Sequence, residues 1–319
     1  MSNPQPSPER STDSILLKSA TKINPIINSL RNEPVAENGM PNRFITSDGF
    51  KLFYRSFIPI SVDKIPKIVI CIHGLHSPGE KFVLMADKFI QEGWGTIAID
   101  LRGHGLSWEK DSDRGDIPNW RYWIRDMDEF FRFISKTYPD SKLYIVAESM
   151  GGAVAVHIAM HQPSALQAIV LIAPALKPIR QVKLSMALQT LTHGVAKNRQ
   201  VIRSHGKGNL TTNTETYQLY QLNDPLRLTS VSPRYYYQVL AMLDTIKRYK
   251  FDKFYPTCLF YGDEDHLIDF KGMKTFIHRL NTKDKALHYI PYGFHELLTD
   301  LNAVRYGLYK KTVQWIQLH

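Results

Sequence analysis

The sequence is poor in cysteine and has no long apolar run. Its 319 residues include two cysteines, Cys71 and Cys258, and both lie in apolar stretches where a thiol fills core space. A small secreted fold held together by disulfides is therefore excluded. No apolar run approaches the roughly 20 residues of a membrane-spanning helix, and the first residues lack the basic-then-apolar pattern of a signal peptide. We expect a soluble cytoplasmic protein, with peripheral contact with a membrane left open.

Motifs for metals and for phosphate-containing cofactors are also absent from the sequence. No G-x-G-x-x-G follows an expected strand, and there is no phosphate-binding loop. His157 and His161 are four residues apart, but the segment HIAMH lacks the glutamate of a zinc protease and no third ligand is in view. We therefore expect neither a metal nor a cofactor.

The net charge of +10 is concentrated in one segment. Residues 174–250 carry twelve Lys and Arg residues against three acidic residues, a net charge of +9. These charges alternate with Leu, Met and Tyr rather than forming a nucleic-acid-binding motif, so we expect no nucleic-acid partner. The basic segment instead favours contact with an anionic membrane surface, and the alternative is a solvated basic face without a membrane role.

Strands and helices alternate along most of the chain. Residues 1–41, rich in Pro, Ser and Asn, predict a flexible N-terminal extension. An Asp-Gly turn at Asp48-Gly49 then predicts a hairpin. The β-branched runs that follow indicate strands covered on both faces, as in a parallel sheet. Expected strands are Arg43–Thr46, Lys51–Phe57, Lys67–Ile72, Thr96–Asp100, Lys142–Ala147, Ala168–Ala173, Thr257–Tyr261 and Ala286–Ile290, and expected helices are Glu80–Glu92, Pro118–Tyr138, Met150–His161, Phe270–Leu280 and Glu296–Leu318.

This order predicts an α/β fold, a mostly parallel, doubly wound sheet that opens with an antiparallel hairpin. Residues 174–250 interrupt the alternation with helical spacing only, which predicts a helical cap inserted before the last strands. The core then comprises residues 42–173 and 251–319. Candidate substrate-binding residues on the cap helices are Leu184, Leu188, Tyr236 and Leu240.

Ser149 is the candidate nucleophile. It stands between a buried strand and two glycines that open a helix, in Tyr144-Ile-Val-Ala-Glu-Ser-Met-Gly-Gly152. Such a strand–turn–helix exposes the serine hydroxyl above the sheet. Ala147 stands where the usual G-x-S-x-G pattern has glycine, a departure of one methyl group.

The base and the acid are expected in the loops after the last two strands. His295 follows the final strand, at the sheet edge where Ser149 emerges, and can take its proton. Asp263 and Asp265 follow the preceding strand, with Asp269 nearby, and spacing alone does not choose between the first two. Backbone N–H groups of Met150 and Leu75 are the candidate oxyanion donors.

Six segments together resemble the α/β-hydrolase family, in its monoacylglycerol lipase and lysophospholipase (serine aminopeptidase-like) branch. They are His73-Gly74-Leu75, Asp100 to Ser107 (DLRGHGLS), Glu148 to Gly152 (ESMGG), Asn223 to Leu226 (NDPL), Gly262 to Asp265 (GDED) and Gly293 to His295 (GFH). The resemblance covers the chain from about Asn42 to its end. It implies Asp265 as the acid, acyl transfer through an acyl-enzyme without a cofactor, and a structural role for Arg102 to Ser107.

The expected activity is hydrolysis of monoacylglycerol or lysophospholipid-type acyl esters by a serine carboxylic ester hydrolase. One alternative is a serine aminopeptidase or another small-ester hydrolase. A selective aminopeptidase needs carboxylates near the substrate amine, and the cap has three acidic residues. The other alternative, a ligand-binding protein on a hydrolase scaffold, usually lacks part of the triad, whereas Ser149, Asp265 and His295 are all present.

Overall fold

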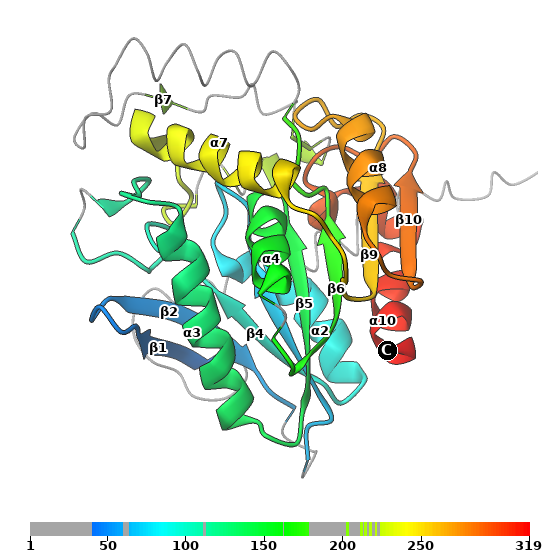
Figure 1. Cartoon of the computed structure of the whole chain (residues 1–319), viewed down its shortest axis with the longest axis horizontal. Helices are drawn as coiled ribbons and strands as arrows, with labels where there is room; N and C mark the ends of the chain where they lie inside the picture. The colour runs from blue at the N-terminus through cyan, green and yellow to red at the C-terminus, as the bar shows by residue number, and fades with distance from the viewer. Residues whose placement is uncertain are drawn as a thin grey trace, which may run out of the picture.

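The computed structural model describes residues 40–59, 64–110, 113–161, 163–178, 202–203, 211–212, 214–215, 217–218, 221 and 224–319. In this part of the chain one eight-stranded sheet runs through the molecule (Figure 1). Its strands are β1 (Met40–Ile45), β2 (Lys51–Phe57), β3 (Lys67–Ile72), β4 (Gly95–Ile99), β5 (Lys142–Glu148), β6 (Leu166–Ile172), β9 (Thr257–Gly262) and β10 (Lys285–Ile290). The expected strands are thus all present, with ends that differ by at most a few residues.

The strand order is β1-β2-β4-β3-β5-β6-β9-β10. β1 pairs antiparallel with β2, and β2 pairs antiparallel with β4, so the expected hairpin opens the sheet. All other pairings in this sheet are parallel. The mostly parallel α/β sheet predicted from the sequence is therefore confirmed. Parallel strands place their carboxyl ends at one edge, where ligands bind in open α/β folds.

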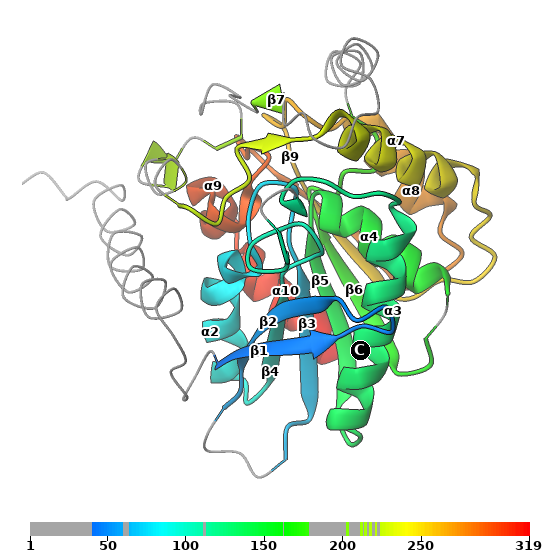
Figure 2. The same cartoon turned by 90° about the vertical axis from the view of Figure 1, so that its left-hand side faces the viewer.

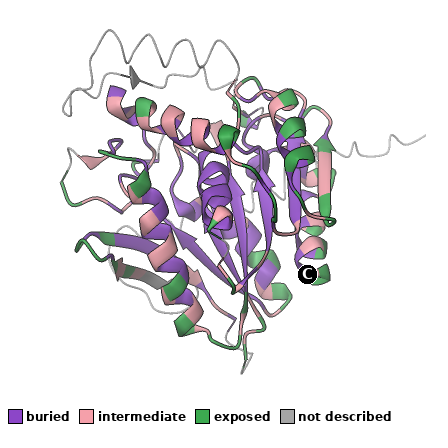
Figure 3. Ribbon diagram, viewed as in Figure 1, coloured by how far each residue is buried: buried purple, intermediate pink, exposed green. Residues whose placement is uncertain are grey.

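Helices cover both faces of the sheet (Figure 2). Buried side chains of α3 (Arg121–Thr137), α4 (Met150–Met160) and α8 (Phe270–Arg279) belong to one apolar cluster. Those of α2 (Val83–Gln91), which follows the short helix η1 (Gly79–Phe82), and of α10 (Leu308–Leu318) belong to the other. Figure 3 shows the central strands buried between these layers, whereas the edge strand β10 is largely half-buried or exposed. Because helices cover both faces of the central strands, the sequences of these strands are apolar at nearly every position.

Helix α7 (Pro233–Arg248) lies across α4 in both views (Figures 1 and 2). Pro233 occupies its first turn, and the Ser232 hydroxyl accepts a hydrogen bond from the Tyr235 N–H at 3.0 Å, which caps the helix. This helix was expected from the spacing of Tyr235 to Ile246. Two short strands, β7 (Ile202–Arg203) and β8 (Ser230–Val231), pair before it. The helix expected around Leu184 and Leu188 lies outside the described residues, and the cap boundaries stay a prediction.

The expected single helix Glu296–Leu318 is wrong, because the chain turns twice within it. It forms η4 (Leu297–Thr299), α9 (Leu301–Arg305) and α10. The Asp300 carboxylate accepts hydrogen bonds from the Asn302 and Ala303 N–H groups and so starts a new helix. Gly307 then takes a left-handed conformation with φ 78°, which interrupts the helical path before α10.

Cys71 and Cys258 are free and buried, as expected. Among the described residues, no helix combines the length and the apolar character needed to cross a bilayer. The same residues contain no group of three or more His, Cys, Asp or Glu side chains arranged to hold a metal ion.

Candidate active site

Ser149 occupies a strained turn between β5 and α4. Its backbone has φ 52° and ψ −119°, a region that costs a residue with a side chain about 1–3 kcal/mol. Its N–H donates to the Ile172 carbonyl at 3.0 Å, and its carbonyl accepts from the Ala175 N–H at 2.8 Å. These bonds to the end of β6 and the chain just beyond it hold the turn in place. Ser149 is partly exposed although its neighbours Glu148 and Met150 are buried.

Small residues around Ser149 allow the backbones to approach. A Cβ atom on Gly151 would lie 2.4 Å from the Ile72 carbonyl oxygen, so a side chain is excluded there. A Cβ atom on Gly74 would lie 3.1 Å from the Cβ of Ser149, which brings the loop after β3 against the serine. Ala147, the departure from the usual pattern, is fully buried within β5 and fits there without distortion of the parallel pairing to β3 and β6.

Ser149, His295 and Asp265 form one hydrogen-bonded chain. The Oγ of Ser149 lies 2.8 Å from the Nε2 of His295. The Nδ1 of the same imidazole lies 2.8 Å from Oδ2 of Asp265. The second carboxylate oxygen of Asp265 accepts hydrogen bonds from the N–H groups of Leu267 at 2.8 Å and Ile268 at 3.0 Å. Both oxygens of Asp265 are therefore held, and the carboxylate fixes the orientation of the imidazole.

The loops after β9 and β10 are fastened to each other. The Glu264 N–H donates to the Gly293 carbonyl at 2.9 Å. A Cβ atom on Gly262 would lie 2.2 Å from that same carbonyl oxygen, so the close approach requires glycine. Since Asp265 follows Gly262 and His295 follows Gly293, this contact sets the distance between the acid and the base.

The other acids of the loop after β9 have different partners. Asp263 accepts a hydrogen bond from the Tyr289 hydroxyl at 2.5 Å. Asp269 caps α8 by accepting from the Lys271 N–H and pairs with Lys177. The geometry thus places Asp265, and neither of its neighbours, against His295, a choice that spacing left open. His266 is half-exposed and faces Glu264.

The charges around His295 favour its protonated form. Burial, the largest single effect, opposes the imidazolium, but the carboxylates of Asp265, Glu148 and Glu296 together outweigh it. Together they raise the pKa of His295 above its ordinary value. An imidazole that accepts a proton readily suits a base that is expected to activate a serine hydroxyl.

Sequence reasoning missed three charged side chains beside this chain of residues. The Nζ of Lys81 lies 2.6 Å from Oε2 of Glu148 and 2.9 Å from Oε2 of Glu296. All three side chains are at most 6% exposed. The sequence feature that could have identified Glu148 and Glu296 is that each stands next to a candidate catalytic residue, Ser149 or His295. Nothing in the sequence links Lys81 to either of them.

The candidate oxyanion donors flank the serine. Met150 is the first residue of α4, where an N–H has no acceptor within its own helix. Leu75 follows Gly74 in the loop that touches Ser149 and is half-buried against the core. The Tyr235 hydroxyl, which sequence reasoning did not single out, donates to Sδ of Met150 at 2.9 Å and lies 2.8 Å from Nε2 of His104.

The cap candidates are only partly described. Leu184 and Leu188 lie outside the described residues. Tyr236 and Leu240 are half-buried on α7 and pack against the core, and burial raises the pKa of Tyr236 to about 12. Leu240 also lines a cavity of about 570 Å³ between α7 and α8, with Leu243 and Phe276. Ser149 and His295 do not line this cavity.

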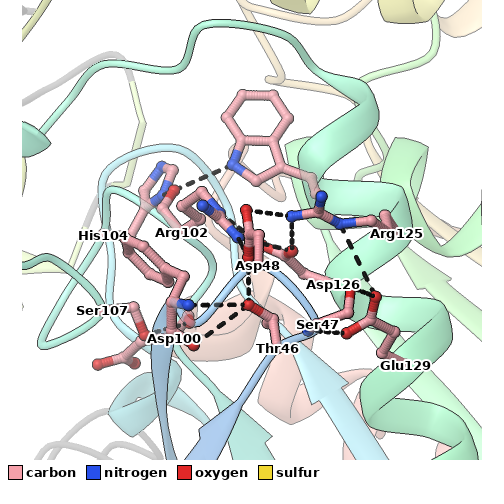
Figure 4. Close-up of polar contacts among 12 residues, drawn as sticks. Thr46, Ser47, Asp48, Asp100, Arg102, His104, Ser107, Arg125, Asp126 and Glu129 are labelled. Carbon is pink, nitrogen blue, oxygen red and sulfur yellow. Dashed lines mark hydrogen bonds and ion pairs between the residues drawn. The ribbon is translucent and has the colours of Figure 1, made fainter.

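The segment Arg102 to Ser107 contacts the hairpin turn, α3 and the end of β4. Figure 4 shows Arg102 close to Asp48 of the hairpin turn and Asp126 of α3. Its guanidinium lies 2.9 Å from Oδ1 of Asp48 and 2.7 Å from Oδ2 of Asp126. The Ser107 hydroxyl donates to the Asp100 carbonyl at 2.6 Å. The loop therefore ties the hairpin to α3.

Residues 63–302 match the profile of a family described as Hydrolase_4, serine aminopeptidase S33. Monoglyceride lipase of Mus musculus is 24% identical over 274 residues, which cover 85% of this chain and 88% of that protein. The uncharacterised protein YnbC of Escherichia coli is 28% identical over 265 residues. That match covers 81% of this chain but 44% of YnbC, so the chain spans less than half the length of that relative.

Solved structures show the same fold. A soluble variant of monoglyceride lipase from Saccharomyces cerevisiae, in complex with a substrate analogue, superposes with a TM-score of 0.76 at 18% identity. The superposition covers 89% of this chain and 96% of the yeast chain. At this identity the likeness concerns the fold.

Proposed function

The chain belongs to the serine aminopeptidase S33 family of α/β hydrolases, and from this membership we propose that it hydrolyses carboxylic esters through an acyl-enzyme formed on Ser149. The observation that carries the proposal is the hydrogen-bonded chain from Ser149 through His295 to Asp265, with 2.8 Å at each contact of the imidazole. Its monoglyceride lipase relatives support an ester rather than another acyl compound as substrate.

In the first half-reaction, the Oγ of Ser149 attacks the ester carbonyl carbon and its proton passes to Nε2 of His295. Asp265 stabilises the imidazolium that forms. The bond between the carbonyl carbon and the alcohol oxygen then breaks, and His295 returns the proton to the departing alcohol. In the second half-reaction, water attacks the acyl-enzyme in the same way, with His295 as base, and the free acid leaves as Ser149 regains its proton.

The negative oxygen of each tetrahedral intermediate requires donors that are already in place. We assign this role to the N–H groups of Met150 and Leu75. The positive end of the α4 dipole supports the first of them. Removal of one such donor typically lowers the rate by about 10²–10³-fold.

The proposed substrates are monoacylglycerols or lysophospholipid-type acyl esters. The relatedness to monoglyceride lipases and the +9 charge of residues 174–250 support this class. A basic segment attracts an anionic lipid surface by about 1 kcal/mol for each Lys or Arg near the headgroups. We expect the cap to bind the acyl chain, with Leu184, Leu188, Tyr236 and Leu240 as candidates.

An aminopeptidase is the second candidate, because the family description names that activity. Recognition of a free amino terminus needs a carboxylate available to the substrate amine. Glu148 and Glu296 lie beside the candidate triad, but both contact the ammonium of Lys81. This pairing favours the esterase over the aminopeptidase.

Hydrolysis of a p-nitrophenyl ester series from acetyl to palmitoyl tests the proposal, with wild type compared with Ser149→Ala. We expect a preference for medium or long acyl chains that disappears in the variant. A preference for acetyl would indicate a small-ester hydrolase instead. Cleavage of aminoacyl-nitroanilides without ester hydrolysis would indicate the aminopeptidase, and inactivity towards both would favour a binding protein.

A further inference from the structure

Three buried charged side chains form a cluster beside the candidate triad: Lys81, Glu148 and Glu296. Lys81 comes from η1, Glu148 from the end of β5, and Glu296 from the loop after β10. The lysine ammonium contacts both carboxylates, at 2.6 Å and 2.9 Å, and its side chain is 3% exposed. Charges this far from solvent are expensive to bury unless they are paired. Each of the three charges is therefore buried with an oppositely charged partner.

The cluster joins the two halves of the site through residues adjacent in sequence. Glu148 immediately precedes Ser149, and Glu296 immediately follows His295. A single ammonium thus connects the strand end that carries the nucleophile with the loop that carries the base. Displacement of either carboxylate would change the distance between Ser149 and His295 through one peptide unit on each side.

Thr211, Tyr217 and Gln221 lie against the same cluster. The Glu296 N–H donates to the Thr211 carbonyl at 2.8 Å, and Nε2 of Gln221 donates to the Glu296 carboxylate at 2.6 Å. The ring of Tyr217 lies with its centroid 5.7 Å from Nζ of Lys81. Glu296, in the loop after β10 that carries His295, therefore contacts η1 through Lys81 and also contacts Thr211 and Gln221.

We propose that Lys81 is a positioning residue for the reaction, which binds the carboxylates of Glu148 and Glu296 and so holds Ser149 against His295. The inference rests on the proposed function, because it assigns Lys81 a role through the nucleophile and the base. Burial, and then Glu296, raise the pKa of Glu148 against the effect of Lys81, whereas Lys81 outweighs burial at Glu296 and lowers its pKa to about 2. With both carboxylates ionised, one ammonium leaves the cluster with one excess negative charge. That charge stabilises the imidazolium of His295 in addition to Asp265.

The charged groups that face His295 come from four directions. Asp265 lies on the loop after β9, Glu148 at the end of β5, and Glu296 on the histidine loop itself. Lys81 neutralises one of the two glutamates. His76, in the loop after β3, also faces His295, but burial and then Arg227 lower the pKa of His76 to about 4. His76 is therefore neutral near pH 7. The charges that can be changed by substitution beside Asp265 are those of Glu148 and Glu296.

Glu148→Gln and Glu296→Gln test the inference, because each replaces a carboxylate with an amide of equal size. Either change removes a negative charge that favours protonated His295. We expect the acid limb of kcat/KM to move to lower pH by about 1 unit in each variant. The His295 imidazole, followed by NMR titration, should shift equally. The matched control is Glu264→Gln on the neighbouring loop, where a carboxylate that is 45% exposed is screened by water and the limb should stay in place.

Lys81→Met tests the positioning itself. Without the ammonium, the buried carboxylates of Glu148 and Glu296 repel each other and push the turn that carries Ser149 away from the loop that carries His295. We expect kcat to fall by more than about 10-fold with a smaller change in KM. Lys81→Met/Glu148→Gln leaves one carboxylate and removes that repulsion. The double variant should therefore recover kcat relative to Lys81→Met, a non-additive result.

The outcomes separate this inference from the proposed function. If Ser149→Ala is inactive but neither glutamine variant moves the acid limb or the His295 titration, the inference is wrong and the proposed function stands. If Ser149→Ala keeps its esterase activity, the proposed function fails. The NMR titration still decides whether the cluster acts on His295. Strictly additive losses in the lysine double variant would also contradict the positioning role.

Discussion

The hydroxyl of Tyr235 donates a hydrogen bond to the sulfur of Met150, 2.9 Å away, and so connects α7 with the residue that follows the candidate nucleophile. The same hydroxyl lies 2.8 Å from Nε2 of His104. Tyr235 is fully buried. One atom of the helix that crosses α4 therefore contacts both the start of α4 and the loop after β4.

Tyr235→Phe removes this hydroxyl and leaves the His104 nitrogen without that partner. We expect the free energy of unfolding to fall by about 1–3 kcal/mol, the usual result of an unsatisfied buried polar group. Esterase activity should fall several-fold, because Met150 supplies a proposed oxyanion donor. Chemical denaturation and ester hydrolysis measure the two effects. Tyr237→Phe, at a position that is 53% exposed, is the control, and equal losses in both variants would contradict the account.

Ser149→Gly should stabilise the fold while it abolishes activity. The positive φ of Ser149, 52°, strains a residue with a Cβ atom, whereas glycine adopts it freely. We expect a gain of about 1 kcal/mol in the free energy of unfolding relative to Ser149→Ala, which keeps the Cβ atom. Thermal melting of the two inactive variants measures this difference. A glycine variant that is no more stable than the alanine variant would show that the turn is not strained.

The pH dependence of activity follows from the raised pKa of His295. Burial opposes the imidazolium, but Asp265, Glu148 and Glu296 outweigh it. The base must be neutral to accept a proton, so the acid limb of kcat/KM should lie above 6.5, the ordinary value for histidine. Asp265→Asn removes the strongest favourable charge, so the limb should move to lower pH and kcat should fall by about 10³–10⁴-fold. An unchanged limb would contradict the role of Asp265.

The same shift predicts how stability depends on pH. The pKa of His295 is higher in the folded protein than in the unfolded chain, so protonation of His295 favours folding. This contribution is complete below the unfolded value near 6.5 and is lost as the pH rises through the folded value. We expect the free energy of unfolding, measured by chemical denaturation across this pH range, to change with pH at a different slope in wild type and in Ser149→Ala/His295→Gln. Parallel curves would show that His295 does not have the raised pKa.

The sheet could be predicted from sequence because parallel strands are buried on both faces. Runs such as Lys67–Ile72 and Lys142–Glu148 are apolar at nearly every position, which leaves little ambiguity. The candidate nucleophile and base, Ser149 and His295, followed from chain order, since each follows a strand that ends at the same edge, whereas Asp265 was implied as the acid by the family resemblance. The break at Asp300 and Gly307 was missed because helical spacing of apolar residues continues across it.

Other parts of the site depend on contacts between distant residues. Spacing did not separate Asp263 from Asp265, because the choice depends on Tyr289, which holds Asp263 from the neighbouring strand. Tyr236 was a candidate, whereas Tyr235 is the residue that α7 turns towards Met150. Lys81 reaches Glu148 and Glu296 across the fold, and these three residues share no local pattern.

The central claim is that Ser149 forms a covalent acyl-enzyme with His295 as its base. Its most direct test is the mass of the intact protein after reaction with a long-chain alkyl fluorophosphonate, followed by peptide mapping. Wild type should gain one phosphonyl group on Ser149, Ser149→Ala should gain none, and His295→Ala should react far more slowly. An unmodified Ser149 in wild type, or a phosphonyl group on another residue with esterase activity lost, would contradict the claim.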